Sequence, residues 1–267
     1  MRKYIAVPAL ILLGSAGAFL MRLAQVRTGF EALTGLPVPG DPWRYLLPAF
    51  LLVLAALLAL AVRRVPESAQ PPAAFANAFS TTDAAMLTLP VMGILLMGVS
   101  GVLDAAKGLR LGLRADLLLG LLSLFSAGAL FPVTAACRRP GSRQAAPETP
   151  RQLDSSFLLV PPVCLVIRLV LTYRQNSIDP SLSAYYVELL AVVFLTLAFY
   201  RLSSFAFKAS RNRRFLLYAG GAIVLSAATL ADGHRLSAAL LYAGGALTLL
   251  GFLLLRLEVL AKPWDNI

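Results

Sequence analysis

Two side chains of opposite charge lie inside neighbouring apolar segments of the chain. Arg168 falls in an apolar segment at residues 157–173, and Glu188 falls in the next one, at residues 184–202. If the two segments form a helical hairpin, both charges lie near the connecting turn and at similar depth. A charge at the centre of a membrane helix costs roughly 2.5 to 3.5 kcal/mol, so such residues face the bundle and find partners. We therefore predict that Arg168 and Glu188 face each other.

Helical spacing extends this polar pair into a candidate site. Thr172 follows Arg168 at i+4, and Tyr185 shares a narrow arc of the next helix with Glu188. Polar groups that converge within apolar walls are what a small-ligand site requires, and these would favour an anionic or zwitterionic small molecule. The alternative is a structural ion pair that fixes helix packing and binds nothing. The candidate ligand-binding residues are Arg168, Glu188, Tyr185, Thr172, Tyr173 and Asp179.

The elements that must position these residues are apolar segments long enough to cross a bilayer. The hydrocarbon core is about 30 Å thick, so a spanning helix needs about 20 mostly apolar residues. Most of the candidates lack a central charge and stop at charged or Pro/Gly-rich residues, which is typical of spanning helices. They cover residues 5–23, 45–62, 86–103, 117–136, 157–173, 184–202, 215–231 and 236–255. The sequence therefore predicts an all-α, polytopic transmembrane bundle of about eight helices.

The composition supports this class and leaves little room for a soluble domain. Hydrophobic residues make up 58% of the 267 residues and charged residues 14%, with a mean hydropathy of +0.76. Soluble domains are about 25% charged. The residues between the apolar segments form short loops, too few to build a soluble domain with its own core. We expect one domain over residues 1–267, entirely in the cell membrane.

The first apolar segment has a second interpretation. Residues 1–3 are Met-Arg-Lys, an apolar run follows, and Ala-Gly-Ala at 16–18 is typical of a secretory signal with its cleavage site. The apolar run continues to Leu23, which is long enough for a first span. We therefore expect a span here, with seven spans as the alternative if the segment is cleaved.

Basic residues set the expected orientation and the expected partners. The net charge is +11, and clusters at 63–64, 138–139 and 211–214 fall on the side that also carries both termini. The positive-inside rule then places both termini in the cytoplasm, although the basic loop at 107–114 argues the other way. Such clusters attract anionic headgroups at about 1 kcal/mol per charge, so we expect the lipid bilayer, and not a nucleic acid, as the partner. A protein partner at these inner basic loops is the alternative.

Two long inner loops are expected to be plain linkers. Residues 63–84 and 138–155 are rich in Pro, Ala and Ser, a composition typical of connecting segments. Recruitment of a partner through them is the alternative.

A short repeat points to close helix packing. Leu-Leu-Tyr-Ala-Gly-Gly-Ala occurs at 216–222 and again at 240–246, near the start of the last two predicted spans. Paired small residues let helix backbones approach closely, so we expect both segments to lie against neighbouring helices. A duplicated transporter architecture is the alternative, because many carriers contain internal repeats.

Enzyme motifs are largely missing from the sequence. It has neither a phosphate-binding P-loop nor a His-Glu-x-x-His metal helix, and its one histidine, His234, excludes a multi-histidine site. We expect no cofactor, no metal and no catalytic activity. Gly-Val-Ser-Gly at 98–101 resembles the Gly-x-Ser-Gly of rhomboid intramembrane proteases, over these four residues.

That resemblance implies Ser100 as a nucleophile that works with a histidine from a later helix. The one histidine, His234, lies in a loop and not in a Gly-containing helix, and the supporting His/Asn pair of the family is absent. The competing interpretation of the tetrapeptide is a packing notch between membrane helices.

Together these features favour a carrier or small-ligand-binding membrane component with its site between the fifth and sixth helices. The alternative is a non-transporting accessory, sensor or scaffold protein that acts through the basic cytoplasmic loops. An intramembrane serine protease is a remote third possibility.

Overall fold

The protein is an all-α bundle in which the predicted spans form long helices. The computed structural model describes residues 4–31, 38, 40–67, 75–138, 155–176, 182–207, 209 and 211–261, and all statements below concern these residues. Eight of the described helices are long and apolar enough to cross a membrane. The helices are α1 (Ala6–Thr28), α2 (Trp43–Arg63), α3 (Phe75–Ala78), α4 (Ala84–Leu111), α5 (Arg114–Ala136), α6 (Ser156–Asn176), α7 (Leu182–Ser203), α8 (Asn212–Thr229) with the 3-10 helix η2 (Leu230–Asp232), and α9 (Leu236–Ala261).

The helices extend beyond the apolar segments that predicted them. The largest difference is α4, which ends at Leu111 and not at residue 103, so Asp104 and Lys107 belong to a helix. Likewise α5 begins at Arg114, which makes Asp116 part of its first turn. A hydropathy pattern detects only the uncharged part of a helix, whereas the hydrogen-bonded backbone continues into the polar interface. Charged residues that the sequence assigns to a loop, such as Asp104, therefore belong to helices.

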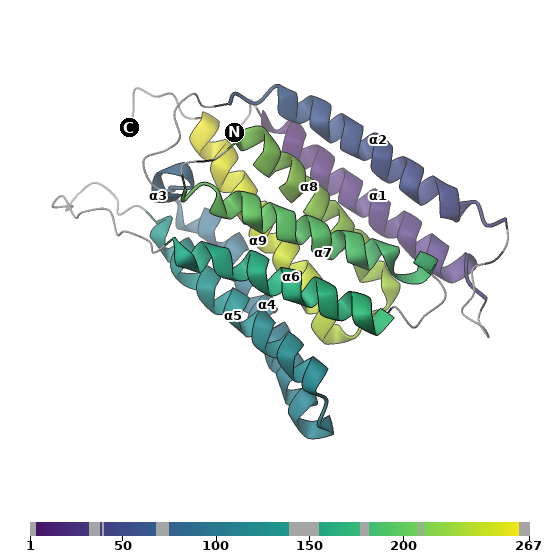
Figure 1. The fold of residues 1–267 in the computed structure, drawn as a ribbon. Coiled ribbons are helices and arrows are strands. Elements are labelled where there is room, and N and C mark those ends of the chain that lie inside the picture. The colour runs from purple at the N-terminus through teal and green to yellow at the C-terminus, as the bar shows by residue number, and fades with distance from the viewer. Residues whose placement is uncertain are drawn as a thin grey trace.

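The spanning helices alternate in direction, so that α1 begins and α9 ends at the same end of the bundle (Figure 1). We call this the terminal end, and the opposite end, which carries the α4–α5 and α8–α9 connections, the cavity end. The α4–α5 hairpin extends beyond the neighbouring helices at the cavity end. Both connections contain a glycine with positive φ, Gly112 and Gly233, each at 65°. Glycine reaches this left-handed conformation without steric cost, which allows the tight reversals.

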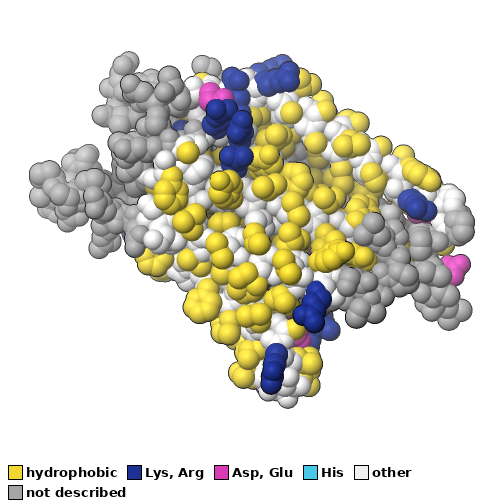
Figure 2. All heavy atoms as spheres, viewed as in Figure 1, with side chains coloured by type: hydrophobic (Ala, Val, Ile, Leu, Met, Phe, Trp, Pro, Cys, Tyr) yellow, Lys and Arg dark blue, Asp and Glu magenta, His cyan; other side chains and the backbone are white. Residues whose placement is uncertain are grey.

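The outer face of the bundle is apolar. Leu13 and Leu52 are 74% and 72% exposed, and both lie in the middle of their helices. On the face drawn in Figure 2, hydrophobic side chains cover the middle and most Lys and Arg side chains gather towards the ends. This is the surface that a bilayer requires, with apolar groups at hydrocarbon depth and cations near the headgroups. The chain is a multi-pass membrane protein.

Glycines bring the helix axes close together. A Cβ atom built on Gly244 of α9 would lie 2.6 Å from the carbonyl oxygen of Gly93 in α4. In the first copy of the repeat, Gly220 of α8 lies against Leu58 and Ile11 in the same way. Both copies therefore pack closely against neighbouring helices, as the sequence predicts. Such contacts gain van der Waals energy where no hydrophobic effect drives association.

Aromatic side chains fill the terminal end, and they correct one prediction about the linkers. Within the loop at 63–84, the residues around α3 are packed: Phe75 and Phe79 are 4% and 0% exposed. Arg256 of α9, itself buried, donates from Nη1 to the carbonyl oxygen of Ala78 at 2.9 Å. The sequence predicts a plain linker here because Pro, Ala and Ser dominate the composition of the loop, and two phenylalanines change this composition little. Their ring contacts join Phe75, Phe79, Phe205, Phe215 and Phe252. Most of the second predicted linker, at 139–154, lies outside the described residues.

Candidate functional site

A cavity of about 480 Å³ opens at the cavity end of the bundle. Its walls come from α4, α5, α6, α7 and α9, which contact one another in that order, and α9 closes the ring by contacting α4. The volume lies in the range of small-ligand pockets, about 300 to 1,000 Å³. The titratable side chains that line it are Asp104, Asp116, Arg168, Glu188, His234 and Arg235.

The cavity reaches well below the helix ends. Arg168 lies eight residues before the end of α6 and Asp104 seven residues before the end of α4. At a rise of 1.5 Å per residue these positions are about 10 to 12 Å from the ends of their helices. At the rim, by contrast, the side chain of Arg235 is 70% exposed. The cavity therefore connects an exposed rim to charges inside the helical layer.

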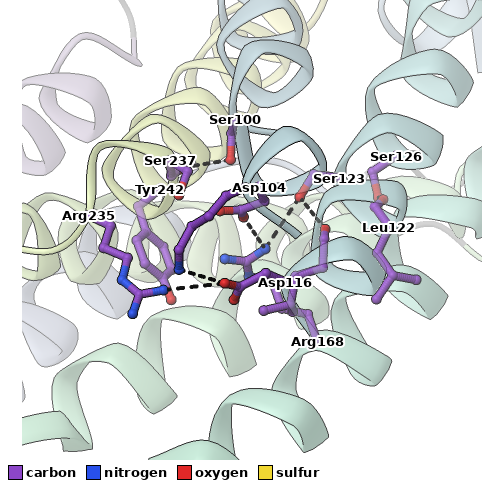
Figure 3. Close-up of polar contacts among 12 residues, drawn as sticks. Ser100, Asp104, Asp116, Leu122, Ser123, Ser126, Arg168, Arg235, Ser237 and Tyr242 are labelled. Atoms are coloured by element: carbon purple, nitrogen blue, oxygen red, sulfur yellow. Dashed lines mark hydrogen bonds and ion pairs between the residues drawn. The ribbon is translucent and has the colours of Figure 1, made fainter. Parts of the chain in front are cut away.

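Arg168 lies at this depth and is only loosely held (Figure 3). The residue is 5% exposed. Its Nη1 is 4.0 Å from a carboxylate oxygen of Asp104 and donates to the hydroxyl of Ser123 at 3.3 Å. Among the described residues its Nε is buried and has no hydrogen-bond partner. The guanidinium therefore keeps hydrogen-bonding capacity that the protein does not use.

The predicted pairing of Arg168 with Glu188 is corrected by this geometry. Within the described part of the chain, Arg168 makes its ion pair with Asp104 and not with Glu188. Both residues line the same cavity. The hairpin of adjacent spans relates Arg168 only to Glu188, whereas the ring also brings α4, which is far away in the sequence, into contact with Arg168.

Glu188 lies in the part of the wall formed by α7, the helix next to α6. Its Oε1 accepts a hydrogen bond of 2.9 Å from the hydroxyl of Tyr242 on α9. Its Oε2 is 4.0 Å from Nε2 of His234, in the connection between η2 and α9. These contacts fix the carboxylate between α7 and α9, where it faces the cavity that also contains Arg168.

Asp116 is neutralised near the rim. Its Oδ2 lies 2.5 Å from Nζ of Lys107, on the preceding helix, and 3.6 Å from Nη1 of Arg235 (Figure 3). The acid thus joins the α4–α5 hairpin to the start of α9. Because two cations share this carboxylate, it contributes little net charge to the cavity.

A second buried ion pair lies beside the cavity. Nε of Arg22 on α1 contacts a carboxylate oxygen of Asp232, and its Nη1 donates to Gln25 at 2.8 Å. The other oxygen of Asp232 is 3.6 Å from Nε2 of His234. Burial acts to lower the pKa of His234, but the carboxylates of Asp232 and Glu188 outweigh it, so that this pKa lies above its ordinary value.

The remaining predicted site residues are divided between the cavity and the surface. Thr172 is buried and lines the cavity one turn from Arg168. Tyr173 is 58% exposed on the outside of the bundle, and Tyr185 is partly buried; neither belongs to the lining. Asp179 lies outside the described residues.

Several residues of the site were missed by the sequence argument for one common reason. Asp104 directly follows the predicted span 86–103, and Asp116 directly precedes the predicted span 117–136. In a hydropathy pattern a charge marks the end of a span and therefore falls in a loop. His234 and Tyr242 have no neighbours in the sequence that indicate a ligand site, because His234 lies in a loop and Tyr242 belongs to the repeat. Acids that directly flank a span are the signal that would have found two of these four.

Ser100 and His234, which the rhomboid resemblance would pair, have other partners. Ser100 is 0% exposed and its hydroxyl donates to the carbonyl oxygen of Ser237 at 2.6 Å (Figure 3). A Cβ atom on the neighbouring Gly101 would lie 2.8 Å from the carbonyl oxygen of Gly120. These contacts give Gly-Val-Ser-Gly the geometry of a packing notch between α4, α5 and α9.

Metal-ligating side chains do not gather in the described part of the chain: no group of three or more His, Cys, Asp or Glu is arranged to hold a metal ion. Comparisons of the chain with known protein families, with curated proteins and with solved structures gave no significant match. The site must therefore be interpreted from its own geometry.

Proposed function

We propose that this membrane protein binds a small solute that carries a carboxylate or a similar anionic group, either as an anion or as a zwitterion, and acts as a carrier for it. The observation that carries the proposal is Arg168, a buried cation in the wall of an open cavity. Among the described residues the protein uses only part of its hydrogen-bonding capacity, because its Nε has no partner.

The energetic cost of Arg168 supports a ligand. A buried donor without a partner costs about 1 to 3 kcal/mol, and a buried charge is costly unless a close partner compensates it. The carboxylate of Asp104, at 4.0 Å, is a distant partner. A ligand carboxylate would accept charge-assisted hydrogen bonds from Arg168. The planar guanidinium is the side chain best suited to donate two parallel hydrogen bonds to a carboxylate, in a bidentate geometry.

Glu188 supports a zwitterionic ligand in particular. It lines the same cavity from α7, with Tyr242 and His234 as its neighbours. A solute whose anionic group lies at Arg168 would have its cationic group within reach of this carboxylate. The two charges would then orient the solute within the cavity.

The two ends of the bundle support transport over simple binding. The cavity is open at one end, while the cluster of phenylalanines around α3 fills the other. Prolines lie within the continuous helices α2, α4, α5 and α6, at Pro48, Pro90, Pro132 and Pro161/Pro162. One-sided access is a feature of alternating-access carriers, and prolines are positions at which a membrane helix can bend. The basic clusters at 63–64 and 211–214 are at the terminal end, so we place that end in the cytoplasm and the cavity on the outside.

Thermal unfolding of the purified protein in detergent, followed with three sets of probes, tests the binding. The probes are the common L-amino acids as zwitterions, succinate as an anion, and choline as a cation without a carboxylate. We expect at least one zwitterion or succinate to raise the Tm by several degrees, because a ligand at 100 times its Kd contributes about 2.7 kcal/mol. Choline should have no effect.

The Arg168→Gln variant should lose this response. Arg201→Gln is the matched control, because Arg201 is also an arginine within a helix whose buried Nε has no partner among the described residues, but it does not line the cavity. The proposal is wrong if no zwitterion or anion stabilises the protein, or if Arg168→Gln responds as the parent does.

Uptake of the stabilising probe into proteoliposomes then tests the carrier role. We expect uptake that Arg168→Gln abolishes and Arg201→Gln preserves. Binding without uptake would instead favour a sensor or accessory protein that uses the same cavity.

A further inference from the structure

The imidazole of His234 lies between two carboxylates at the edge of the cavity. Its Nε2 is 3.6 Å from Oδ2 of Asp232 and 4.0 Å from Oε2 of Glu188. Among the described residues, neither this Nε2 nor that Oδ2 has a hydrogen-bond partner, although both are buried. A lone pair on Nε2 would point at two anions, whereas an N–H at this position, in the neutral Nε2–H tautomer or in the imidazolium, would point a proton at them. Between these two forms the carboxylates favour the imidazolium, because its positive charge is attracted by both.

Other charged and titratable groups also lie near His234. Arg22 on α1 pairs with Asp232 and opposes protonation of the histidine. Tyr242 on α9 lies with its ring centroid 6.0 Å from that of the imidazole, and its hydroxyl donates to Oε1 of Glu188. The more distant charges of the same cavity are Asp104 on α4, Asp116 on α5, Arg168 on α6 and Arg235 beside His234.

Protonation of His234 changes the charge balance of the cavity. The lining contains three carboxylates, those of Asp104, Asp116 and Glu188, and two guanidinium groups, those of Arg168 and Arg235. Lys107 also pairs with Asp116, so with a neutral histidine the charges of this group balance. With an imidazolium the group carries one net positive charge, which favours an entering anion.

We propose that His234, held between Asp232 and Glu188, is a proton-binding site coupled to the anion site, so that the protein binds its solute together with a proton. This inference rests on the proposed function, and it adds a second species to the same cavity. The proton binds to the lone pair of the imidazole, and no bond between heavy atoms is formed or broken.

The coupling follows from reciprocity. If a proton on His234 strengthens the binding of an anion, then a bound anion raises the affinity of His234 for a proton by the same factor. The raised pKa of His234 is consistent with this role, because a larger fraction of the imidazole is protonated at a given pH than in a free histidine. Wherever binding requires the imidazolium, the apparent affinity for the anion falls tenfold for each pH unit above that pKa.

The sign of the potential in the cavity can be measured without knowing the solute. Ala238 lines the cavity from α9 and can be replaced by cysteine in a chain that carries Cys137→Ala and Cys164→Ala. The probes are two methanethiosulfonates of similar size, the anionic sulfonatoethyl reagent and the cationic trimethylammonioethyl reagent. Both react with the same thiolate, so the ratio of their rates cancels the ionisation of the cysteine and reports the local potential.

We expect the ratio of the anionic to the cationic rate to rise by about threefold or more between about pH 8.5 and pH 5.5, as a positive charge appears close to the thiol. In His234→Asn the ratio should be flat over the same range. In Glu188→Gln the midpoint should move to lower pH, because one of the charges that favour protonation is removed. A free thiol in solution gives the intrinsic ratio for comparison.

A pH-independent ratio in the parent chain would overturn the proton site and leave the proposed solute site intact. The same conclusion follows if His234→Asn keeps the pH dependence of the parent. If the cysteine at position 238 reacts with neither reagent at any pH, the cavity is closed to water, and both proposals are wrong.

Discussion

The two buried arginines of the cavity end differ in how fully the protein satisfies them. Arg22 contacts Asp232 directly, donates to Gln25 and lies 5.5 Å from the ring centroid of Tyr186. Arg168 has an acid at 4.0 Å, a long hydrogen bond to Ser123 and a side-chain interaction with Tyr242. We interpret Arg22 as a structural cation that connects α1 to η2. Arg168 has the same burial without the same partners, which is the reason to assign it a ligand.

The stability of the protein should depend on the titration of His234. Because the pKa of His234 is raised in the folded protein, its protonation stabilises the fold below the unfolded-state pKa of about 6.5. That stabilisation is lost as the pH rises through the folded-state pKa. We expect the Tm of the parent to exceed that of His234→Asn by a few degrees more at pH 6 than at pH 8.5. Thermal unfolding of both proteins at the two pH values provides the measurement, and a constant difference would contradict the raised pKa.

At the level of helices, close packing decides which glycines are essential. A Cβ atom on Gly93 of α4 would lie 2.5 Å from the carbonyl oxygen of Gly244, and backbone atoms cannot move aside as a flexible side chain can. Gly128 of α5 has no atom within 4 Å of such a Cβ. The two positions therefore form a matched pair within spanning helices.

We expect Gly93→Ala to destabilise the protein by about 1 to 3 kcal/mol, because overpacking forces α4 and α9 apart. Gly128→Ala should be neutral or stabilising by up to about 1 kcal/mol, because alanine is the better helix former. Denaturation midpoints of the two variants in detergent provide the comparison. Equal effects would mean that α4 and α9 are not as close as described.

Helix boundaries explain why the candidate site was predicted only in part. Arg168, Thr172 and Glu188 were found because they lie within apolar segments, where a polar side chain is conspicuous. Asp104 and Asp116 were missed because each lies one residue beyond a predicted span, where charge is unremarkable. The helical backbone continues past the point where the composition changes, so the wall of the cavity includes residues that a hydropathy argument assigns to loops.

At the level of the whole molecule, the orientation in the membrane decides which compartment supplies the solute. The basic loop at 107–114 argues against a cytoplasmic terminal end, but Lys107 forms an ion pair with Asp116, so part of that charge is compensated. The clusters at 63–64 and 211–214 then dominate the balance.

Reporter fusions test this orientation. We expect alkaline phosphatase to be active when it is inserted between residues 233 and 234, and green fluorescent protein to fluoresce when it is attached after residue 261, because the former folds only outside and the latter only in the cytoplasm. The reverse pattern would turn the cavity towards the cytoplasm. Activity of both reporters at both positions would show a mixed orientation.

Repeated crossing of the membrane is readable from the amino-acid sequence alone, because the apolar length required by a bilayer is a local property that each segment carries independently. The sequence also determines that Arg168 and Glu188 need a polar environment, since their charge has the same cost in any arrangement of the helices.

The partners of Arg168 and Glu188 depend instead on the three-dimensional packing of the helices. The ring of α4, α5, α6, α7 and α9 brings Asp104 to Arg168, and His234 and Tyr242 to Glu188, across large separations in sequence. Contacts of this kind depend on where close packing at glycines sets each helix, and no local pattern in the chain encodes that choice.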